Sequence, residues 1–490
     1  MNALQEVNFT SPNSMEITLS EVLQELSLLK FEMTLMIGSL VLLVAGLITR
    51  EEKVFKSVLA GTFIASLFYI GQTNVSVISA SGAIEIDAVS NLLRLLFASI
   101  SIWIIFYTIP DRKSEHYFLI LSILIGSSFM LSANHLLLFY LAIELTSISS
   151  YLITGLGAQK KTFEAALKYL LFGGVSSAIM LYGISIVYAL TGEMRIDQLG
   201  GLIINAEPFL HVGVLCILCG LFFKISIIPF HIWVPSTYEQ APTDAVAILS
   251  IVPKIAGLFL LHRVLTGFEL LSNEGYYHLI LGLGIISILL GTFGALRQQL
   301  PKRMLAYGAI AHSGLMLATI IIPGESGGLS FLWYSVIYSI MNMAVFHVIS
   351  IYESNHIISI EDYKGTGKIQ PYLGAIALWL LIALTGLPPT AGFSAKFILF
   401  TSMWKVFQTS GDLWMVTYTV IGILSVVFAL FYYLKIPYAS FILSGKQRDG
   451  ITFSKVSQVL VTIFSIVLLW MFISPELLNK IAFNINLMDW

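Results

Sequence analysis

Long apolar segments recur along the whole chain and are separated by short polar intervals. Because about 20 consecutive apolar residues cross a membrane as a helix, this pattern predicts fourteen transmembrane spans. The spans lie at about 32–49, 54–71, 88–108, 117–134, 135–156, 164–190, 210–231, 241–265, 278–296, 304–322, 329–352, 372–403 (interrupted), 413–437 and 456–474. No polar interval is long enough to fold alone. We therefore expect one all-α, polytopic membrane domain over residues 1–490.

Composition agrees with this class. The chain is 57% hydrophobic and 11% charged, against about 25% charged residues in soluble domains, and its mean hydropathy is +0.87. Residues 1–29 contain no Lys or Arg and do not read as a cleavable signal peptide, so we expect the first span to insert by itself. The lipid bilayer is the first expected partner, and no nucleic-acid partner is expected.

The distribution of Lys and Arg predicts the orientation. With fourteen spans, alternate loops on one side hold 16 of the 26 basic residues, the other side holds five, and five lie within spans. Basic loops stay on the cytoplasmic side of a membrane. This bias predicts that both termini lie on the outer side.

The seventh and eighth spans carry the most unusual residues. Lys224 and Lys254 lie in apolar sequence, where a lysine costs roughly 2.5–3.5 kcal/mol on insertion scales and therefore usually marks a functional site. Pro229 and Pro235 are expected to break or kink the seventh span, and His231 lies at that break. We interpret the lysines as ion-transfer groups; His231 is either a proton relay or a packing residue.

The fifth and sixth spans add a carboxylate and another lysine. Glu144 lies in the middle of the fifth span, followed by four Ser and Thr residues. It is either a partner for a buried lysine or part of a hydrogen-bonded clamp between helices. Lys168 begins the sixth span, where it can support the site or simply extend its amine to the membrane surface.

The twelfth span repeats the features of the seventh. The segment GLPPTAG contains Pro388 and Pro389 and cannot continue a regular helix, and Lys396 follows it. Paired broken helices in two halves of a chain are typical of inverted repeats with ion sites near the midplane. His312, on the tenth span, is placed to bridge two charged sites, although a packing role is the alternative.

Two other polar pairs have simpler interpretations. Asp87 and Arg94 are seven residues apart in the third span, which suits an ion pair near the membrane surface. Cys216 and Cys219 have no second ligand pair nearby, so a metal or redox site is not expected. No metal or redox cofactor is expected in this chain.

These residues, in this order, resemble the antiporter-like membrane subunits of respiratory complex I, the NADH:quinone oxidoreductase, and most closely its subunit N. The resemblance covers nearly the whole chain. The most specific segments are FYLAIELTSISSYLITG, PFHIWVPSTYEQAPT, AILSIVPK, LAYGAIAHSG and LTGLPPTAGFSAKF.

The resemblance implies a fold of fourteen helices with two inverted five-helix repeats, spans 4–8 (117–265) and spans 9–13 (278–437), each a proton channel. It implies proton transfer by Glu144, its paired Lys224, the central Lys254 and the outlet Lys396, with His312 between the last two. NADH, FMN, iron–sulfur clusters and quinone are implied for partner subunits. It also implies M-like and K-like neighbours and a hydrophilic redox arm in a bacterial inner membrane.

Sequence features separate this chain from sister subunits and leave two alternatives. Subunit M has glutamate where this chain has Lys396, and subunit L ends in a long lateral helix. This chain departs from the family pattern at Ser236 and Asp244. The resemblance therefore does not predict which residues form the cytoplasmic inlet near the eighth span. The alternatives are a subunit of a multisubunit cation/proton antiporter, and a scaffold whose charges only fix helix packing.

Overall fold

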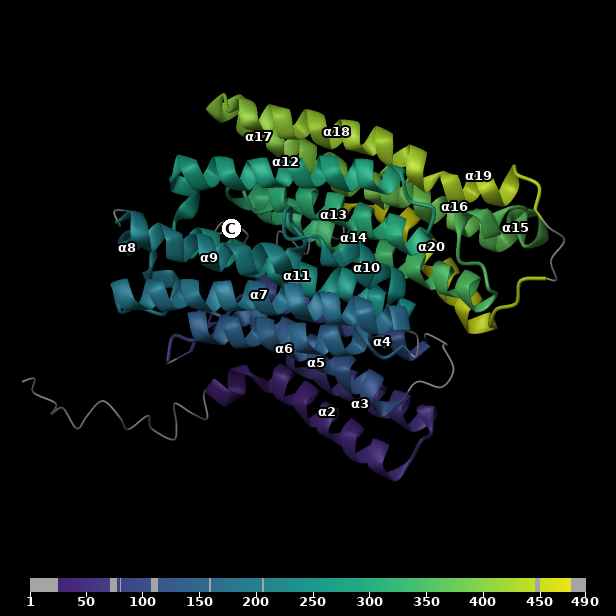
Figure 1. Ribbon diagram of the computed structural model, residues 1–490, viewed down its shortest axis with the longest axis horizontal. Helices are drawn as coiled ribbons and strands as arrows, with labels where there is room; N and C mark the ends of the chain where they lie inside the picture. The colour runs from purple at the N-terminus through teal and green to yellow at the C-terminus, as the bar shows by residue number, and fades with distance from the viewer. Residues whose placement is uncertain are drawn as a thin grey trace, which may run out of the picture.

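The protein is a bundle of long helices that run side by side (Figure 1). A computed structural model describes residues 25–70, 77–79, 81–106, 113–157, 160–204, 207–445 and 450–476. The two chain termini, for which the charge bias predicts an outer position, lie outside these ranges.

The long helices coincide with the apolar segments of the sequence. They are α2 (Lys30–Ile48), α3 (Glu52–Ile70), α4 (Ala88–Phe106), α5 (Ser114–Ser132), α6 (Leu136–Thr154), α7 (Lys160–Thr191), α9 (Pro208–Ile225), α11 (Thr243–Gly267), α12 (Glu274–Leu296), α13 (Pro301–Thr319), α14 (Glu325–Ser354), α16 (Pro371–Thr385), α17 (Ala391–Ser410), α18 (Leu413–Tyr433) and α20 (Lys455–Ile473). Among the described residues, eleven helices are long and apolar enough to cross a membrane. The chain is therefore a multi-pass membrane protein, while the total of fourteen spans stays a prediction.

Short elements connect these helices. They are β1 (Val77–Ile78), β2 (Glu85–Ile86), η2 (Ile196–Gln198), α8 (Gly200–Ile204), α10 (Trp233–Gln240), η3 (Leu270–Ser272), η4 (Ile360–Tyr363), α15 (Thr366–Ile369) and α19 (Lys435–Phe441). The strands pair antiparallel, Val77 opposite Ile86. In Figure 1, α15 and α19 lie at one end of the bundle and α8 at the other. We call these the α15 end and the α8 end.

Helix α11 forms the centre of the bundle. All residues of the most apolar 18-residue stretch of α11 are buried. In the corresponding stretches of α2, α18 and α20, about a third of the residues or fewer are buried. Helices α5, α9 and α14 pack along α11, and α2 and α18 lie at opposite edges of the view (Figure 1). Apolar side chains exposed at these edges suit contact with lipid, since a lipid-facing surface needs no polar cover.

Two spans are broken, as the prolines predict. Helix α9 ends at Ile225 and α10 begins at Trp233, with Ser226 in the left-handed region (φ 65°). Helix α16 ends at Thr385 and α17 begins at Ala391, with Gly386 in the same region (φ 86°). In both breaks the left-handed residue directly follows the last helical residue.

The first break contains Pro229 but not Pro235. Pro235 is the third residue of α10, where its missing N–H is not needed because the first helical N–H groups have no intrahelical acceptor. In the second break, Pro388 and Pro389 both lie between the half-helices. The chain therefore leaves the helix within the predicted segments, although the first break is shifted toward α9.

The predicted ion pair between Asp87 and Arg94 is wrong. Arg94 pairs instead with Glu32 of α2, with its Nη2 2.7 Å from the carboxylate Oε1. Asp87 pairs with Arg263 of α11 at 2.7 Å. Each residue has found a partner on another helix, a tertiary contact that spacing along one helix cannot indicate.

Candidate functional site

Three lysines lie within the helical bundle, each almost fully buried. Lys224 on α9, Lys254 on α11 and Lys396 on α17 are 3%, 1% and 5% exposed. Within the described ranges, none of their amines lies within 4.0 Å of a carboxylate oxygen. A lysine is rarely buried without a paired charge, so these three form the candidate site.

The Lys224 amine is held by a serine and not directly by Glu144. It donates a hydrogen bond to the Ser147 hydroxyl at 3.1 Å. Ser147 and Glu144 are three residues apart on α6 and so lie on adjacent positions of one helix face. The half-buried Glu144 carboxylate accepts a short hydrogen bond from Ser177 of α7. Among the described residues, no direct ion pair therefore joins Glu144 and Lys224, and each is held by a different serine; their pairing stays a prediction.

Lys254 lies at the centre of the bundle, on the buried helix α11. Its amine donates to the backbone carbonyl of Ala309 on α13 at 2.8 Å and lies 5.8 Å from the centre of the Tyr338 ring. An ammonium at this distance from an aromatic face is stabilised by the ring quadrupole. Both of these contacts of Lys254 are therefore with neutral groups.

His312 joins the surroundings of Lys254 to those of Lys396. Its Nδ1 is 2.8 Å from the Tyr334 hydroxyl, and its ring centre is 5.3 Å from that of Tyr338. Both lysines lie within electrostatic range of the imidazole. The bridging role of His312 stays a prediction.

The Lys396 amine caps the end of the broken helix α16. It donates to the carbonyl oxygens of Thr385 at 2.6 Å and Leu384 at 3.2 Å, which are among the last residues of that helix. Carbonyls at a helix C-terminus carry partial negative charge and favour a cation. Glycine suits position 386, because its φ of 86° is rarely adopted by other residues and a Cβ would lie 2.6 Å from the Lys396 Cδ.

Two predicted residues lie away from this group. Lys168 is on the exposed face of α7, where its amine pairs with Glu164 at 2.8 Å and both side chains are more than half exposed. This position suits an amine that extends toward the membrane surface. His231 is half-buried in the first break, and in the part of the chain that the structure describes no hydrogen bond joins it to a lysine.

Sequence reasoning missed the hydroxyl groups that hold the charges. Ser147 and Ser177 anchor Lys224 and Glu144, and Tyr334 and Tyr338 surround His312. Both tyrosines are almost completely buried. Their spacing of four residues in an apolar segment places them on one helix face, which is the signal that could have pointed to them.

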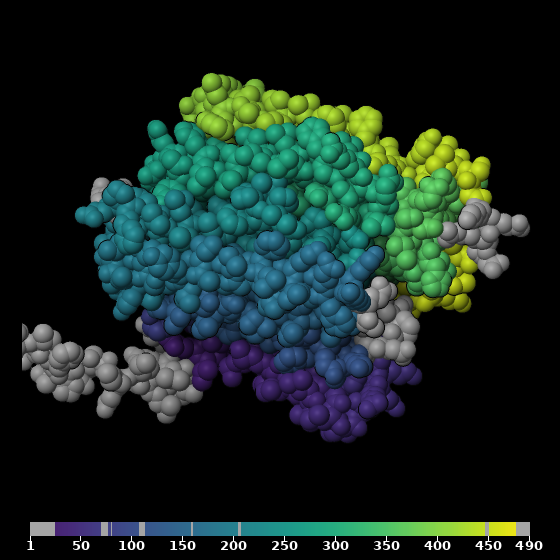
Figure 2. Space-filling model, viewed as in Figure 1, coloured from purple at the N-terminus to yellow at the C-terminus, as the bar shows by residue number. Residues whose placement is uncertain are grey.

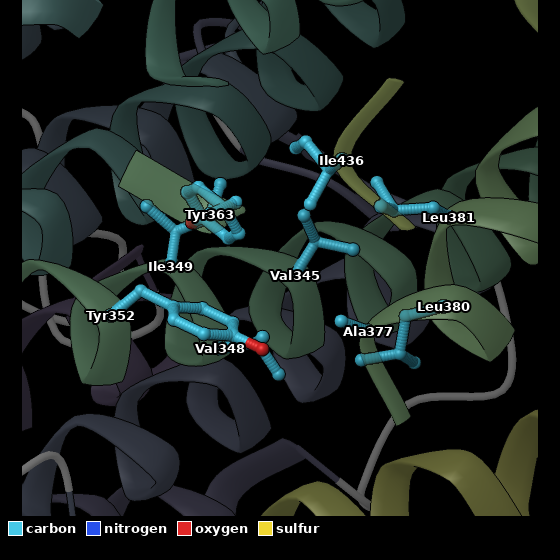
Figure 3. A pocket seen from close by; sticks show the side chains of 9 residues that line it. All are labelled: Val345, Val348, Ile349, Tyr352, Tyr363, Ala377, Leu380, Leu381 and Ile436. Carbon is cyan, nitrogen blue, oxygen red and sulfur yellow. The ribbon is translucent and has the colours of Figure 1, made fainter. Parts of the chain in front are cut away.

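Two cavities lie near these groups. Figure 2 shows the face of the molecule formed by α7, α9 and α12. A cavity of about 240 Å³ lies beside the first break, lined by Ser176 and by apolar side chains that include Pro229. A cavity of about 10 Å³ between α14, α16 and α19 is lined by hydrocarbon side chains and by the rings of Tyr352 and Tyr363 (Figure 3). A cavity so small and apolar does not hold ordered water. It therefore offers no proton route to Lys396.

Metal-type ligands do not gather in the described residues. No group of three His, Cys, Asp or Glu side chains is arranged to hold a metal ion in those ranges. Cys216 and Cys219 are free thiols of intermediate exposure on α9. The ionisable groups of the site are therefore lysine, histidine and glutamate.

Known sequences are similar to this chain. A family described as "NADH:quinone oxidoreductase/Mrp antiporter, TM" matches residues 133–427, which include all of the charged site residues. "NADH-quinone oxidoreductase subunit N 2" of Sorangium cellulosum is 35% identical over 382 residues, covering 72% of this chain and 75% of the relative. The chain belongs to the NADH-quinone oxidoreductase subunit N family.

Solved structures have the same fold as this member of the subunit N family. A chain of respiratory complex I from Thermus thermophilus with bound aureothin superposes with a TM-score of 0.77 and 26% identity, over 92% of this chain and 98% of that one. A chain of the Mrp complex from Dietzia sp. gives a TM-score of 0.83 at 18% identity, over 95% and 98%. The second likeness shows the fold alone.

Proposed function

We propose that this chain is a proton-translocating membrane subunit of NADH:quinone oxidoreductase. The observation that carries the proposal is the chain of buried groups Glu144, Lys224, Lys254, His312 and Lys396. Three of its lysines are held by neutral oxygens inside membrane helices. Intramembrane ionisable groups of this kind mark ion pathways, and membership of the subunit N family selects the complex.

The proposal includes the full topology. It takes fourteen spans, with α9–α10 and α16–α17 each counted as one, and two inverted repeats over 117–265 and 278–437. The two breaks support the repeats, because each has a left-handed residue directly after its first half-helix. The α15 end faces the cytoplasm and both termini face the outer side of a bacterial inner membrane, in agreement with the positive-inside rule.

The mechanism begins at the Glu144 cluster. A change of charge reaching Glu144 from the redox reaction alters the field at Lys224, since Glu144 lies about one helical turn from Ser147, which accepts the hydrogen bond of Lys224. The Lys224 proton then moves toward Lys254. Transfer across 100 mV requires about 2.3 kcal/mol per charge, which is within the energy that a nearby unit charge supplies in a protein.

The second half of the path runs through His312. From Lys254, the Tyr338 ring and the His312–Tyr334 pair lead toward Lys396. Lys396 releases the proton on the outer side. Its position at the end of α16 keeps the ammonium stabilised until it is discharged.

Partner subunits supply the redox reaction. We place NADH, FMN, iron–sulfur clusters and quinone on those subunits, because the site described above offers protonatable groups. The expected neighbours in the membrane are an M-like and a K-like subunit, with the hydrophilic arm acting from a distance. The structural likeness to a chain of respiratory complex I supports a multisubunit membrane assembly.

The test compares redox turnover with proton uptake in inverted membrane vesicles. The variants are Lys254→Ala and Glu144→Gln, with assembly of the complex measured in the same membranes. We expect normal assembly and loss of both NADH-driven quinone reduction and proton uptake. If both activities persist, the buried charges are structural and the proposal is wrong.

A further experiment distinguishes the redox-driven proton pump from the antiporter alternative. The fold likeness to the Mrp chain is compatible with an exchanger driven by an ion gradient without a redox partner. Vesicles lacking the redox subunits should then still exchange cations for protons. Exchange that disappears with those subunits supports the redox-driven assignment.

A further inference from the structure

A buried ion pair that the mechanism above does not use lies at the α15 end of α11. His116, in the first turn of α5, places its Nε2 2.8 Å from the Asp244 Oδ2, in the first turn of α11. The two side chains are 2% and 4% exposed. Helix α5 packs along α11, so the pair lies between two helices, about one turn inside the bundle.

A cavity lies close to the first turn of α11. Thr243, the residue before Asp244, donates a short hydrogen bond to Glu353 of α14 and accepts one from Lys302 at 3.3 Å. Glu239, Lys302 and Glu353 line a cavity of about 30 Å³. Its three charged side chains offer the polar partners that a water molecule needs in a cavity of this size. Through the contacts of Thr243 with Lys302 and Glu353, the first turn of α11 is connected to the side chains that line this cavity.

Unsatisfied hydroxyls continue inward from this end. Within the described residues, the buried Tyr238 hydroxyl and the buried Thr237 hydroxyl on α10 have no hydrogen-bond partner. Buried polar groups without a protein partner usually bind ordered water. The Tyr238 hydroxyl is within electrostatic range of Tyr338, whose ring faces the Lys254 amine.

The distance between the pair and Lys254 suits a short water chain. Ten residues of α11 separate Asp244 from Lys254, which is about 15 Å along a helix. Tyr338 borders this interval, because its hydroxyl donates to the Ser250 carbonyl at 3.2 Å, one turn before Lys254. Tyr238 lies on α10, which directly precedes α11 in the chain. A few waters bound to these hydroxyls are enough to connect the ends.

We propose that His116 and Asp244 form the proton-uptake site that reloads Lys254 from the cytoplasm, with Tyr238 as a relay. This inference rests on the proposed proton-pumping function and adds residues to it. The imidazole and carboxylate together accept a proton from water in the cavity. They then release one to the water beside Tyr238, whose oxygen accepts a proton as its own O–H proton moves on toward Lys254.

A purely structural role for Asp244 is the competing explanation. Its Oδ1 accepts a hydrogen bond from the Ala245 N–H at 3.0 Å, and a carboxylate in the first turn stabilises a helix. The Tyr238 hydroxyl separates the two explanations. Because it has no protein partner among the described residues, Tyr238→Phe should not destabilise the fold, whereas a relay loses a link.

The test uses the assembled complex in inverted vesicles. The variants are Asp244→Asn, Asp244→Glu and Tyr238→Phe, with NADH-driven proton uptake, assembly and the H₂O/D₂O rate ratio as measurements. We expect Asp244→Asn to lower proton uptake on the order of 10²-fold and Asp244→Glu to restore much of it. Tyr238→Phe should lower it about tenfold and raise the rate ratio, with normal assembly.

Two controls make the result decisive. Glu32→Gln alters another buried ion pair outside the proposed path and should not change proton uptake per assembled complex. Lys254→Ala tests the proposed function itself. If Lys254→Ala abolishes pumping while Asp244→Asn and Tyr238→Phe leave the rate and the isotope ratio unchanged, this inference fails and the proposed function stands. If Lys254→Ala also has no effect, the proposed function fails with it.

Discussion

Arg94→Leu should strongly destabilise the outer part of the bundle, because it leaves a carboxylate buried without its cation. The Arg94 Nη2 lies 2.7 Å from Glu32, which is 0% exposed. Arg94 also donates to Ser128 and to Asn91, each at 3.2 Å. Removing one member of a buried pair costs about 3–5 kcal/mol, whereas removing both members together often costs little.

The predicted magnitude can be converted into a melting temperature. With an unfolding entropy of about 2.1 cal/mol/K per residue, a chain of 490 residues loses about 1 °C for each kcal/mol. We therefore expect Arg94→Leu to lower the Tm of the detergent-purified chain by about 3–5 °C. The double variant Arg94→Leu with Glu32→Leu should recover most of this loss.

An exposed ion pair provides the control for this cycle. Arg195 and Asp197 are 2.7 Å apart, but about a third of each side chain is exposed. Arg195→Leu should change the free energy of unfolding by less than about 1 kcal/mol. If Arg94→Leu has no larger effect than this control, or if the double variant is less stable than Arg94→Leu, the buried pair does not act as described.

Three further predictions concern the lysines and the β-hairpin. Ser147→Ala removes the hydroxyl that accepts a hydrogen bond from Lys224, and a hydrogen bond to a charged group contributes about 1.5–3 kcal/mol. Proton uptake should therefore fall at least about tenfold with assembly intact. Unchanged uptake would show that Ser147 is not a functional partner. Gly386→Ala should lower the Tm, because the left-handed conformation costs an alanine roughly 1–2 kcal/mol. It should also lower proton uptake, because the new Cβ displaces Lys396. Retention of wild-type uptake would contradict the second expectation. Arg263→Leu removes the cation that pairs with Glu85 and Asp87, two partly exposed carboxylates at the hairpin. It should lower the Tm by about 1 °C or less without changing proton pumping. A large pumping defect would refute a purely structural role for Arg263.

The sequence predicted the helical class and the broken helices because these follow from local chemistry. Apolar length sets the spans, and adjacent prolines cannot continue α16 into α17. Burial of Lys224, Lys254 and Lys396 was also predictable, since their helices have apolar residues on every face. The structure moved the first break toward α9, because a proline such as Pro235 is tolerated in a first helical turn.

Contacts between helices were not predictable in the same way. The partner of Arg94 comes from α2, and helical spacing pointed instead to Asp87. Ser147 was visible only as one of several polar residues after Glu144, and nothing along the chain ranks it above its neighbours. Such contacts depend on helix rotation and packing, which are set by the whole bundle and not by one segment.

Buried cations in this protein have two kinds of partner, and this difference supports a functional role for the lysines. Arg94, which has no place in the proposed path, is neutralised directly by a carboxylate. Lys254 and Lys396 are instead held by backbone carbonyls. A neutral amine still has two N–H groups and can donate to a carbonyl, so these hydrogen bonds persist whether the lysine carries a proton or has released it. A carboxylate would fix the charged form. The carbonyl partners of Lys254 and Lys396 therefore suit the proposed role of these amines as groups that gain and lose a proton, whereas the carboxylate partner of Arg94 suits a static contact.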